Sequence, residues 1–455
     1  MLEARLGRPL TSFSLAGSRA LVWIVLVGVC LRVASALFQG NAVTDLPGVY
    51  DQISYDELAR RVVDGYGFTF ATGHWPATRA GEPTAHWSYL YTLYLSAVYA
   101  VAGFQPLIAR LIQAVIAGIV HPWLAWRIGR SVFGPRVGLL AALFSTVYVY
   151  FFYYAGALVT ETFYILGVLW TLDVSVRLAR GTRRPSPGLW LELGFAIGVT
   201  LLLRQVFVVF VPVLFAWLVW NIPMKNTATA ASRSITRALR LTLLVGLAEA
   251  SLVVVLLIAP WTVRNALDFG IFVPLNTNAG YAFYWANHPI QGTDFVPLLP
   301  LKYDELIPAE LLPLNEAELD RALLGRGLGF VVDDPGRCVL LSLSRVKEYF
   351  KFWPSSQSGL VSNVSRVGSF GLFLPLIVYG VWVSMKLVRS TSNSNQRSGI
   401  VLLFLFSCVY TMIHLLSWAL IRYRLPVDSV LLLFAALGLA PIADPLLQRI
   451  PGFGR

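Results

Sequence analysis

The chain has 455 residues, of which 56% are hydrophobic and only 13% are charged. A soluble domain carries about 25% charged residues, so this composition excludes a soluble protein and indicates that a bilayer is the solvent. The formal net charge of +12 comes mainly from short loops between apolar runs, where it indicates membrane orientation rather than nucleic-acid binding. The cysteines, Cys30, Cys338 and Cys408, are too far apart for a disulfide framework or a metal-ligand spacing.

Apolar runs of the length that crosses a hydrocarbon core as a helix recur along the chain. We expect about ten spans, near residues 21–38, 106–126, 137–153, 160–177, 188–203, 205–221, 240–260, 369–386, 400–418 and 427–444. The run 88–102 is short for a span, so we interpret it as a helix at the outer surface.

Basic residues gather in alternate loops, which by the positive-inside rule places both termini in the cytoplasm of a plasma-membrane protein. The terminal ones are Arg5, Arg8, Arg449 and Arg455. Within a single membrane domain covering residues 1–455, this orientation leaves two long outer segments, 39–105 and 261–368. We expect the chemistry in these segments, with the catalytic motif and a surface helix in 39–105. In the second one, residues 315–352 have the pattern of two amphipathic helices joined by a turn.

Two carboxylates at the outer face have a structural and a functional interpretation. Asp51 comes at the start of a short helical pattern, where it is either an N-cap or a general base at the membrane surface. Glu161 begins a span, where a helix N-terminus favours an acidic side chain. Both residues therefore remain candidates for catalysis and for helix capping.

Several arginines lie where membrane energetics disfavours them. Arg204 interrupts an apolar stretch and needs a polar partner, unless it extends to the interface. Arg264 follows a span that ends in Pro-Trp, and Arg422 and Arg424 lie on the outer side against the positive-inside trend. Arginine binds phosphate well because its planar fork donates two bonds at once. Carboxylates and arginines beside an apolar wall suit a lipid-linked phosphate donor.

A set of strings carries a family resemblance. They are Asp51-x-x-x-Tyr55-x-x-Leu58-Ala59, Gly65-Tyr66-Gly67-Phe68, Thr160-Glu161-Thr162, and the residues at 110–113, 133–137, 260–265, 274–280, 285–289 and 422–426. In order and spacing the chain resembles, over nearly its whole length, the GT-C superfamily of membrane glycosyltransferases. The specific group is the one that includes the protein O-mannosyltransferases and the lipid A aminoarabinose transferase. Where many relatives have a basic residue before the surface helix, this chain has His86, and Gln52 replaces a second acid.

The resemblance implies an all-α, GT-C-like polytopic bundle of about ten transmembrane helices with amphipathic helices on the outer face. It also implies a glycosyltransferase that moves a sugar, with inversion, from a polyprenyl-phosphate donor to a glycan, lipid or protein acceptor. Asp51 is then the base and Glu161 orients the acceptor or the sugar. The residues expected to bind the substrate are Tyr55, His86, Arg204, Arg264, Asn265, Arg422, Tyr423 and Arg424. Trp87, Tyr281 and Trp285 are candidates for stacking on sugar faces.

No metal ion or other cofactor is expected, because arginine can replace a divalent ion at a monophosphate and no compact cluster of hard ligands is visible. Membrane lipids are expected partners and nucleic acid is not. The alternative function is a transporter or flippase for a lipid-linked or anionic substrate. A transporter predicts inverted repeats and matching broken helices in the two halves, and the sequence shows no such symmetry.

Overall fold

A computed structural model describes residues 15–45, 51–76, 78–180, 186–222, 233–297, 303–356 and 358–447, and helices dominate these residues. Within these ranges no strand forms, and β structure is limited to two isolated bridges in the segment 69–83. The terminal arginines used above for orientation, Arg5, Arg8, Arg449 and Arg455, lie outside the described residues. The all-α fold class is confirmed.

Seven helical stretches are long and apolar enough to cross a bilayer, among the described residues. They lie in α2 (Leu15–Gln39), α5 (Pro106–Phe133), α8 (Glu161–Arg180), α11 (Arg233–Phe269), α15 with α16 (Leu360–Arg366 and Leu372–Ser390), α17 (Ser394–Leu416) and α18 (Ile421–Leu447). In the fifth of these stretches, the π-helical turn η6 (Val367–Gly371) joins α15 to α16.

Three further predicted spans take broken or shortened forms. Helices α6 (Pro135–Val147) and α7 (Val149–Gly156) form one stretch bent by 51°. Helix α9 (Pro187–Leu203) and the stretch formed by η1 (Gln205–Val209) with α10 (Phe210–Asn221) are shorter apolar helices separated at Arg204. Together with the seven long stretches, these elements lie at the positions of the ten predicted spans. Among the described residues, seven of them, or eight with the bent pair, are long and apolar enough to cross a bilayer.

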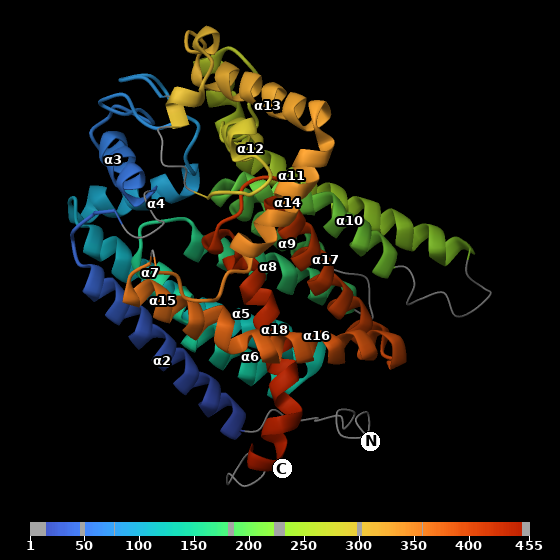
Figure 1. The fold of residues 1–455 in the computed structure, drawn as a ribbon. Coiled ribbons are helices and arrows are strands. Elements are labelled where there is room, and N and C mark those ends of the chain that lie inside the picture. Colours follow the sequence, from blue (N-terminus) through green and yellow to red (C-terminus); the bar gives the residue numbers. More distant parts are fainter. Residues whose placement is uncertain are drawn as a thin grey trace.

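The remaining helices gather at one end of the bundle, which we call the site end. They are α3 (Asp51–Val63), α4 (Tyr89–Ala102), α12 (Ala279–Asn287), α13 (Glu316–Asp333) and α14 (Pro335–Tyr349), with short 3-10 turns η3 (Pro289–Gln291), η4 (Tyr303–Leu306) and η5 (Ala309–Leu311). In Figure 1, α3, α12 and α13 lie at the top, whereas α2 begins and α18 ends at the bottom. Helix α4 is the expected short helix at 88–102, and α13 and α14 are the two expected amphipathic helices.

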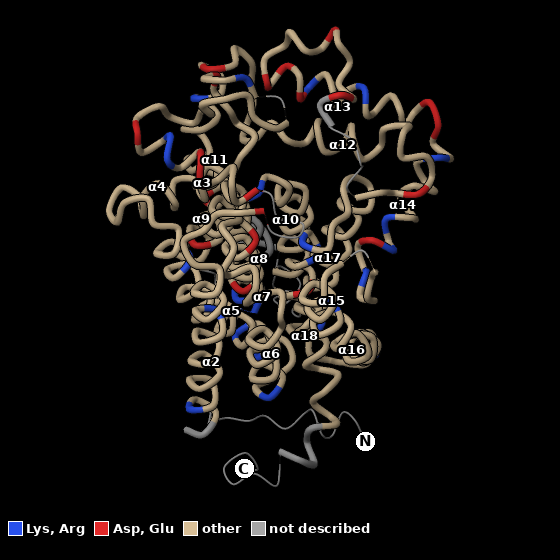
Figure 2. Tube along the Cα trace, turned by 60° about the vertical axis from the view of Figure 1, so that its left-hand side comes forward, with Lys and Arg blue, Asp and Glu red and all other residues tan. Residues whose placement is uncertain are grey.

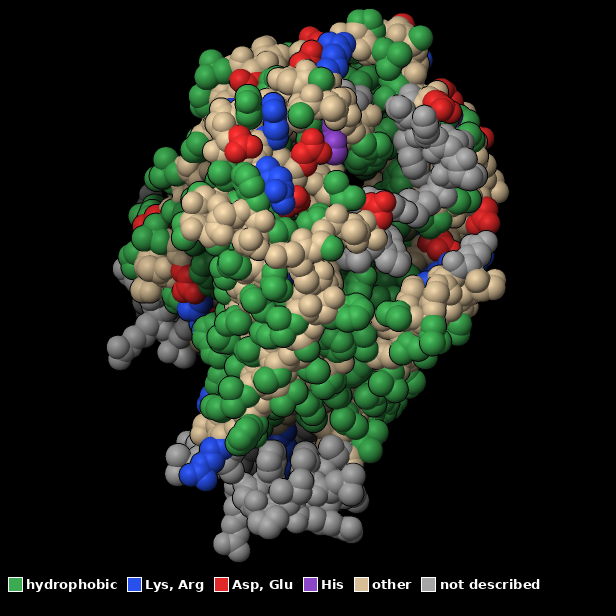
Figure 3. Space-filling model, turned by 90° about the vertical axis from the view of Figure 1, so that its left-hand side faces the viewer, with side chains coloured by type: hydrophobic (Ala, Val, Ile, Leu, Met, Phe, Trp, Pro, Cys, Tyr) green, Lys and Arg blue, Asp and Glu red, His purple; other side chains and the backbone are tan. Residues whose placement is uncertain are grey.

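Charge follows this polarity of the bundle. In Figure 2 the acidic residues gather toward the site end, and basic residues mark the opposite ends of α2 and α6. Figure 3 shows a continuous belt of hydrophobic side chains below the charged site end. Such a belt is the surface that a bilayer covers. The protein is therefore a multi-pass membrane protein.

Close backbone contacts hold the transmembrane helices together. Helices α16 and α18 meet at Gly380 and Gly438, where a methyl group on Gly380 would lie 1.7 Å from the carbonyl oxygen of Phe434. Small residues at such crossings let helices approach within van der Waals distance, which matters because lipid supplies no hydrophobic force between them. The start of α18 carries the predicted Arg422, so this crossing supports the site.

We predict that Gly380→Ala destabilises the protein by about 1–3 kcal/mol, because the backbones of α16 and α18 must separate to admit the methyl group. Thermal unfolding of the detergent-solubilised protein measures the loss. The matched control is Gly325→Ala on α13, where nothing lies within 4 Å of the added methyl group. There we expect no loss, because alanine favours a helix over glycine. Equal unfolding temperatures for both variants would contradict the prediction.

Candidate active site

Asp51 is the first residue of α3, and its carboxylate faces the start of α18. Its Oδ2 lies 2.9 Å from Nη1 of Arg422. The Arg422 side chain is 9% exposed and that of Asp51 is 24% exposed. A guanidinium this deeply buried needs a compensating charge, so Asp51 and Arg422 fix each other although 371 positions separate them.

Glu161 and Arg204 form the second ion pair of the site. Arg204 donates to Oε1 of Glu161, and its Nε donates to Oγ1 of Thr160 over 2.8 Å. Nε of Arg422 lies 3.7 Å from the same Oε1 of Glu161. We call Asp51, Glu161, Arg204 and Arg422 the acid–arginine cluster, because this chain of ion pairs joins all four.

The backbone places each member of the cluster at a helix end. Glu161 opens α8, where the helix dipole favours an acid. Arg204 has extended backbone angles, φ −151° and ψ 114°, and separates α9 from η1. The arginine that the sequence marks as costly in an apolar stretch therefore lies at a break between two helices and pairs with Glu161.

Amide side chains hold the segment that leads into Glu161. The Nε2 of Gln113 donates to the carbonyl oxygens of Ala155 and Ala157, over 3.0 and 2.8 Å. The Oε1 of Gln52, next to Asp51, accepts from the amide of Leu158 over 3.5 Å. A glutamine buried in a span needs such partners, and these contacts connect the starts of α3 and α8.

Tyr423 lies between the two arginines of the cluster. The guanidinium carbon of Arg204 is 5.2 Å from its ring centre and that of Arg422 is 5.1 Å away. On α17, the ring of His414 stacks on Tyr423 with centroids 5.1 Å apart. The phenol ring thus separates two like charges and gives each a cation–π contact.

Arg422 keeps Asp51 ionised. Burial alone would raise the pKa of the Asp51 carboxyl, but the ion pair with Arg422 and the charge of Arg204 outweigh it and lower this pKa below its ordinary value of 3.8. An ionised carboxylate at neutral pH can accept a proton. Within the cluster, Oε2 of Glu161 is buried and has no hydrogen-bond partner among the described residues.

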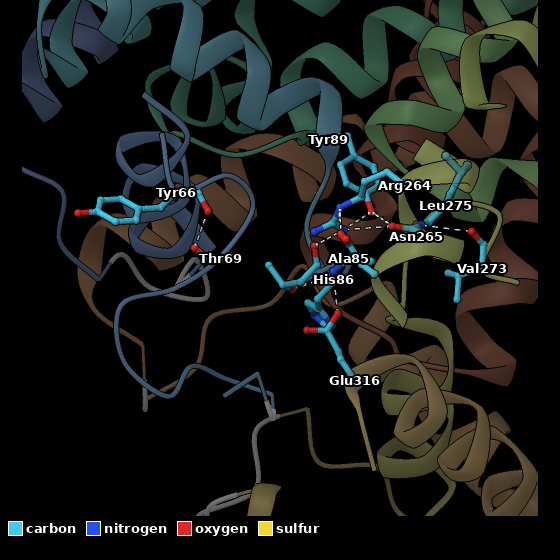
Figure 4. A network of polar contacts seen from close by, with 12 residues as sticks. Tyr66, Thr69, Ala85, His86, Tyr89, Arg264, Asn265, Val273, Leu275 and Glu316 are labelled. Carbon is cyan, nitrogen blue, oxygen red and sulfur yellow. Dashed lines mark hydrogen bonds and ion pairs between the residues drawn. The ribbon is translucent and has the colours of Figure 1, made fainter. Parts of the chain in front are cut away.

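Arg264 and Asn265 bind the backbone of neighbouring segments, as Figure 4 shows. Arg264 donates to the carbonyl oxygen of Thr84 over 2.9 Å and pairs with Asp268. Asn265 donates to the carbonyl oxygens at 273 and 275, over 3.2 and 2.7 Å, and accepts from the hydroxyl of Tyr89. Both residues therefore connect the loop before α4 to the loop after α11, outside the ion pairs of the acid–arginine cluster.

Glu316 secures the same region, also in Figure 4. At the start of α13 it accepts from the hydroxyls of Thr78 and Thr277, over 2.6 and 2.5 Å, and from the amide of Ala85 over 2.8 Å. The adjacent His86 lies against the carbonyl oxygen of Thr277 at 3.3 Å, and burial lowers its pKa although Glu316 is near. A neutral His86 cannot provide the fixed positive charge of the basic residue that it replaces.

The structure places Arg424 in a different network. It pairs with Asp428 at 2.9 Å, donates to the carbonyl oxygen of Tyr349 and lies 3.8 Å from the ring centre of Phe370. The predicted Tyr55 lies nearer the cluster, one turn after Asp51, and its hydroxyl accepts from the amide of Ser88 over 3.3 Å. Of the substrate-binding candidates, Arg204 and Arg422 thus pair with Glu161 and Asp51, and Tyr423 contacts both arginines. Arg424 does not contact Asp51 or Glu161 among the described residues.

Sequence reasoning did not single out Thr160, Gln113, Glu316 or His414 as parts of the site. The signal was present for two of them, because Gln113 and His414 are polar side chains inside apolar spans. The sequence gives no such signal for Glu316, because its sequence context is that of an ordinary helix start. No group of three or more His, Cys, Asp and Glu side chains in the described part of the chain is arranged to hold a metal ion.

We predict that Arg422→Gln raises the pKa of Asp51, because burial then acts without the opposing ion pair. Infrared difference spectroscopy measures this as the pH at which a protonated carboxyl band appears, and Asp51→Asn identifies the band. Arg326→Gln is the matched control, because Arg326 belongs to an exposed pair with Glu310. If the band titrates at the same pH in Arg422→Gln and the wild type, the ion pair does not control Asp51.

The fold and the cluster define a polytopic helical membrane protein with a charged site at one end of its bundle, and comparisons with known proteins show what it is similar to. Residues 88–262 match the family described as dolichyl-phosphate-mannose-protein mannosyltransferase. A comparison with curated proteins finds no match. The resemblance to the GT-C superfamily is confirmed.

Among solved structures, the chain is similar to the oligosaccharyltransferase of Archaeoglobus fulgidus. The apo form gives a TM-score of 0.59 at 16% identity, covering 94% of this chain and 51% of that chain. The same enzyme in complex with an inhibitory peptide and a dolichol-phosphate gives 0.59 at 16%, covering 95% and 51%. This chain therefore spans about half the length of the archaeal enzyme. ArnT from Cupriavidus metallidurans bound to undecaprenyl phosphate gives only 0.40 at 14%, covering 94% and 80%, and supports no conclusion.

Proposed function

We propose that the protein transfers a sugar from a polyprenyl-phosphate donor to an acceptor hydroxyl or amine, with inversion at the anomeric carbon. The observation that carries the proposal is the acid–arginine cluster, in which an ionised carboxylate and two arginines meet at one end of a lipid-facing bundle. A lipid-linked phosphate requires both arginine forks and an apolar path for its tail. The matched mannosyltransferase family supports this donor class.

In this reaction Asp51 is the general base. The acceptor oxygen or nitrogen attacks the anomeric carbon and its proton goes to the Asp51 carboxylate, while the bond from that carbon to the phosphate oxygen breaks. Polyprenyl phosphate leaves with the bonding electrons. Arg204 and Arg422 stabilise the charge that develops on it, and Glu161 keeps Arg204 in place. The role of Arg264 is to hold the loop before α4, as its backbone contacts support.

The site end is proposed to face away from the cytoplasm of the plasma membrane, so that both termini are cytoplasmic. Helix α8 begins at the cluster and runs to Arg177 and Arg180, and α16 ends with Lys386 and Arg389. Basic residues at the ends of spans favour the cytoplasmic side. Segments 39–105 and 261–368 are then the two outer segments of one membrane domain, as the sequence predicts.

We expect Asp51→Asn to lower transfer by about 10²–10⁴-fold, the contribution of a general base. The transfer rate is measured in proteoliposomes with matched protein insertion, as the radiolabelled sugar that passes from a synthetic polyprenyl-phosphate donor to extracted envelope fractions. Because the pKa of Asp51 is lowered, kcat/KM of the wild type should stay level as the pH falls through the range of ordinary carboxyl groups. Full activity of Asp51→Asn excludes this base, and flux of the donor without product would favour a flippase.

Arg204→Lys is expected to lower kcat/KM for the donor by about 10–100-fold. Lysine keeps the positive charge, but it has no planar fork. It therefore cannot contact Thr160 and Glu161 while it also donates two bonds to a phosphate. Steady-state kinetics with varied donor concentration provide the measurement, and Arg326→Lys on the exposed surface is the control. An unchanged kcat/KM would remove Arg204 from donor binding.

A further inference from the structure

Aromatic rings from three segments meet beside Asp51, in a group that we call the aromatic cluster. Its members are Trp75, His86, Trp87, Tyr281 and Trp285. Trp75 stacks on Trp285 with centroids 5.5 Å apart at 30°, and it contacts His86 edge-on at 5.4 Å. His86 in turn contacts Trp87 at 5.1 Å and Tyr281 at 5.7 Å.

The cluster has one exposed ring above a buried base. Trp75 is 47% exposed, whereas Trp87 is 6% exposed and Tyr281 and Trp285 are 1% exposed. The base is rigid, because Glu316 ties the backbone of Ala85 to the hydroxyls of Thr78 and Thr277. An exposed indole on a rigid aromatic base offers an apolar face without loss of side-chain freedom on binding.

Two buried donors in this cluster have no acceptor. Nε1 of Trp87 and the hydroxyl of Tyr281 lack a hydrogen-bond partner among the described residues. A buried polar group left unpaired costs about 1–3 kcal/mol, so a ligand whose acceptor reaches either donor gains affinity. A prenyl tail brings none. The ordinary interfacial tryptophan turns its N–H toward lipid headgroups, whereas that of Trp87 is buried within the protein.

The aromatic cluster and the acid–arginine cluster are neighbours. The ring of Trp87 lies 5.4 Å from that of Tyr55, which follows Asp51 by one helical turn. Asp51 and His86 are close enough that each affects the pKa of the other. Trp75 lies 6.5 Å from Trp87, so a ligand bound on Trp75 is connected to Tyr55 and Asp51 through the Trp87 ring.

We propose that the aromatic cluster binds a pyranose ring of the acceptor, so that the acceptor is a glycan. A pyranose has an apolar face of C–H groups that stacks on an indole, and hydroxyls that accept from buried donors, which matches Trp75 together with Trp87 and Tyr281. A peptide acceptor is the outcome that the test separates from a glycan, because some peptides also dock on aromatic rings. This inference rests on the proposed function, because that reaction supplies the need for an acceptor beside Asp51.

The test measures glycan binding without turnover. Saturation-transfer NMR is recorded on the full-length protein in nanodiscs with oligosaccharides released by mild acid from the envelope of the source cells. We expect binding that weakens at least tenfold in Trp75→Ala and is largely retained in Trp75→Phe, which keeps a ring face. Trp220→Ala on α10, a residue 71% exposed, is the matched control and should bind as the wild type does.

Two further binding experiments show whether the aromatic cluster binds the acceptor glycan, the sugar of the donor or a peptide. A polyprenyl-phosphate sugar and a tryptic digest of envelope proteins are each tested with Trp75→Ala. The inference is overturned if Trp75→Ala weakens binding of the donor sugar or of peptides but not of the released glycans. It is also overturned if Trp75→Ala and the wild type bind the glycans equally. Asp51→Asn separates this test from the proposed function, because it should bind the glycans normally while losing transfer.

Discussion

The site depends on the burial of Arg422 between two carboxylates. A guanidinium at a helix start within an apolar bundle is stable only if its charge is compensated. Asp51 at 2.9 Å and Glu161 at 3.7 Å provide that compensation from the starts of α3 and α8. Since Arg204 pairs with the same Glu161, the requirement of one buried charge fixes the relative positions of α3, α8, α18 and the break after α9.

This constraint also explains how much of the site the sequence could predict. Arg204 and Arg422 are costly or unusual where they stand, so physical chemistry alone marks them as needing partners. Asp51 and Glu161 are also ordinary residues for a helix start, so their positions alone left their roles open. Their pairing was not predictable from spacing, because the partners come from distant segments and meet only when the helices pack. The family resemblance named Asp51 as the centre, and the contacts of the cluster give that prediction a physical context.

Arg424 shows why a motif does not assign a side chain. In the string 422–426 the two arginines look equivalent. In the structure both lie on the first turn of α18. Positions two apart on an α-helix differ by about 200° around its axis, so only one of them can face Asp51. Arg422 does, and Arg424 turns toward Asp428 and Phe370. The helix starts at Ile421, before the predicted span 427–444, and this earlier start determines which arginine meets Asp51.

The positions of helices were predictable where the length and hydropathy of an apolar run determine them. The positions of breaks within helices were less predictable. The long spans, the short helix α4 and the pair α13 and α14 follow from apolar runs and amphipathic patterns. The break at Arg204 agrees with the predicted boundary between the spans 188–203 and 205–221, and the ion pair with Glu161 explains it. The break at Tyr148 lies inside the predicted span 137–153 and was not predicted. At Arg204 the lost helical hydrogen bonds are offset by a charge-assisted contact with Glu161. A continuous helix through Arg204 would carry its side chain away from α8, so the irregular backbone at this point is what brings a second arginine to the cluster.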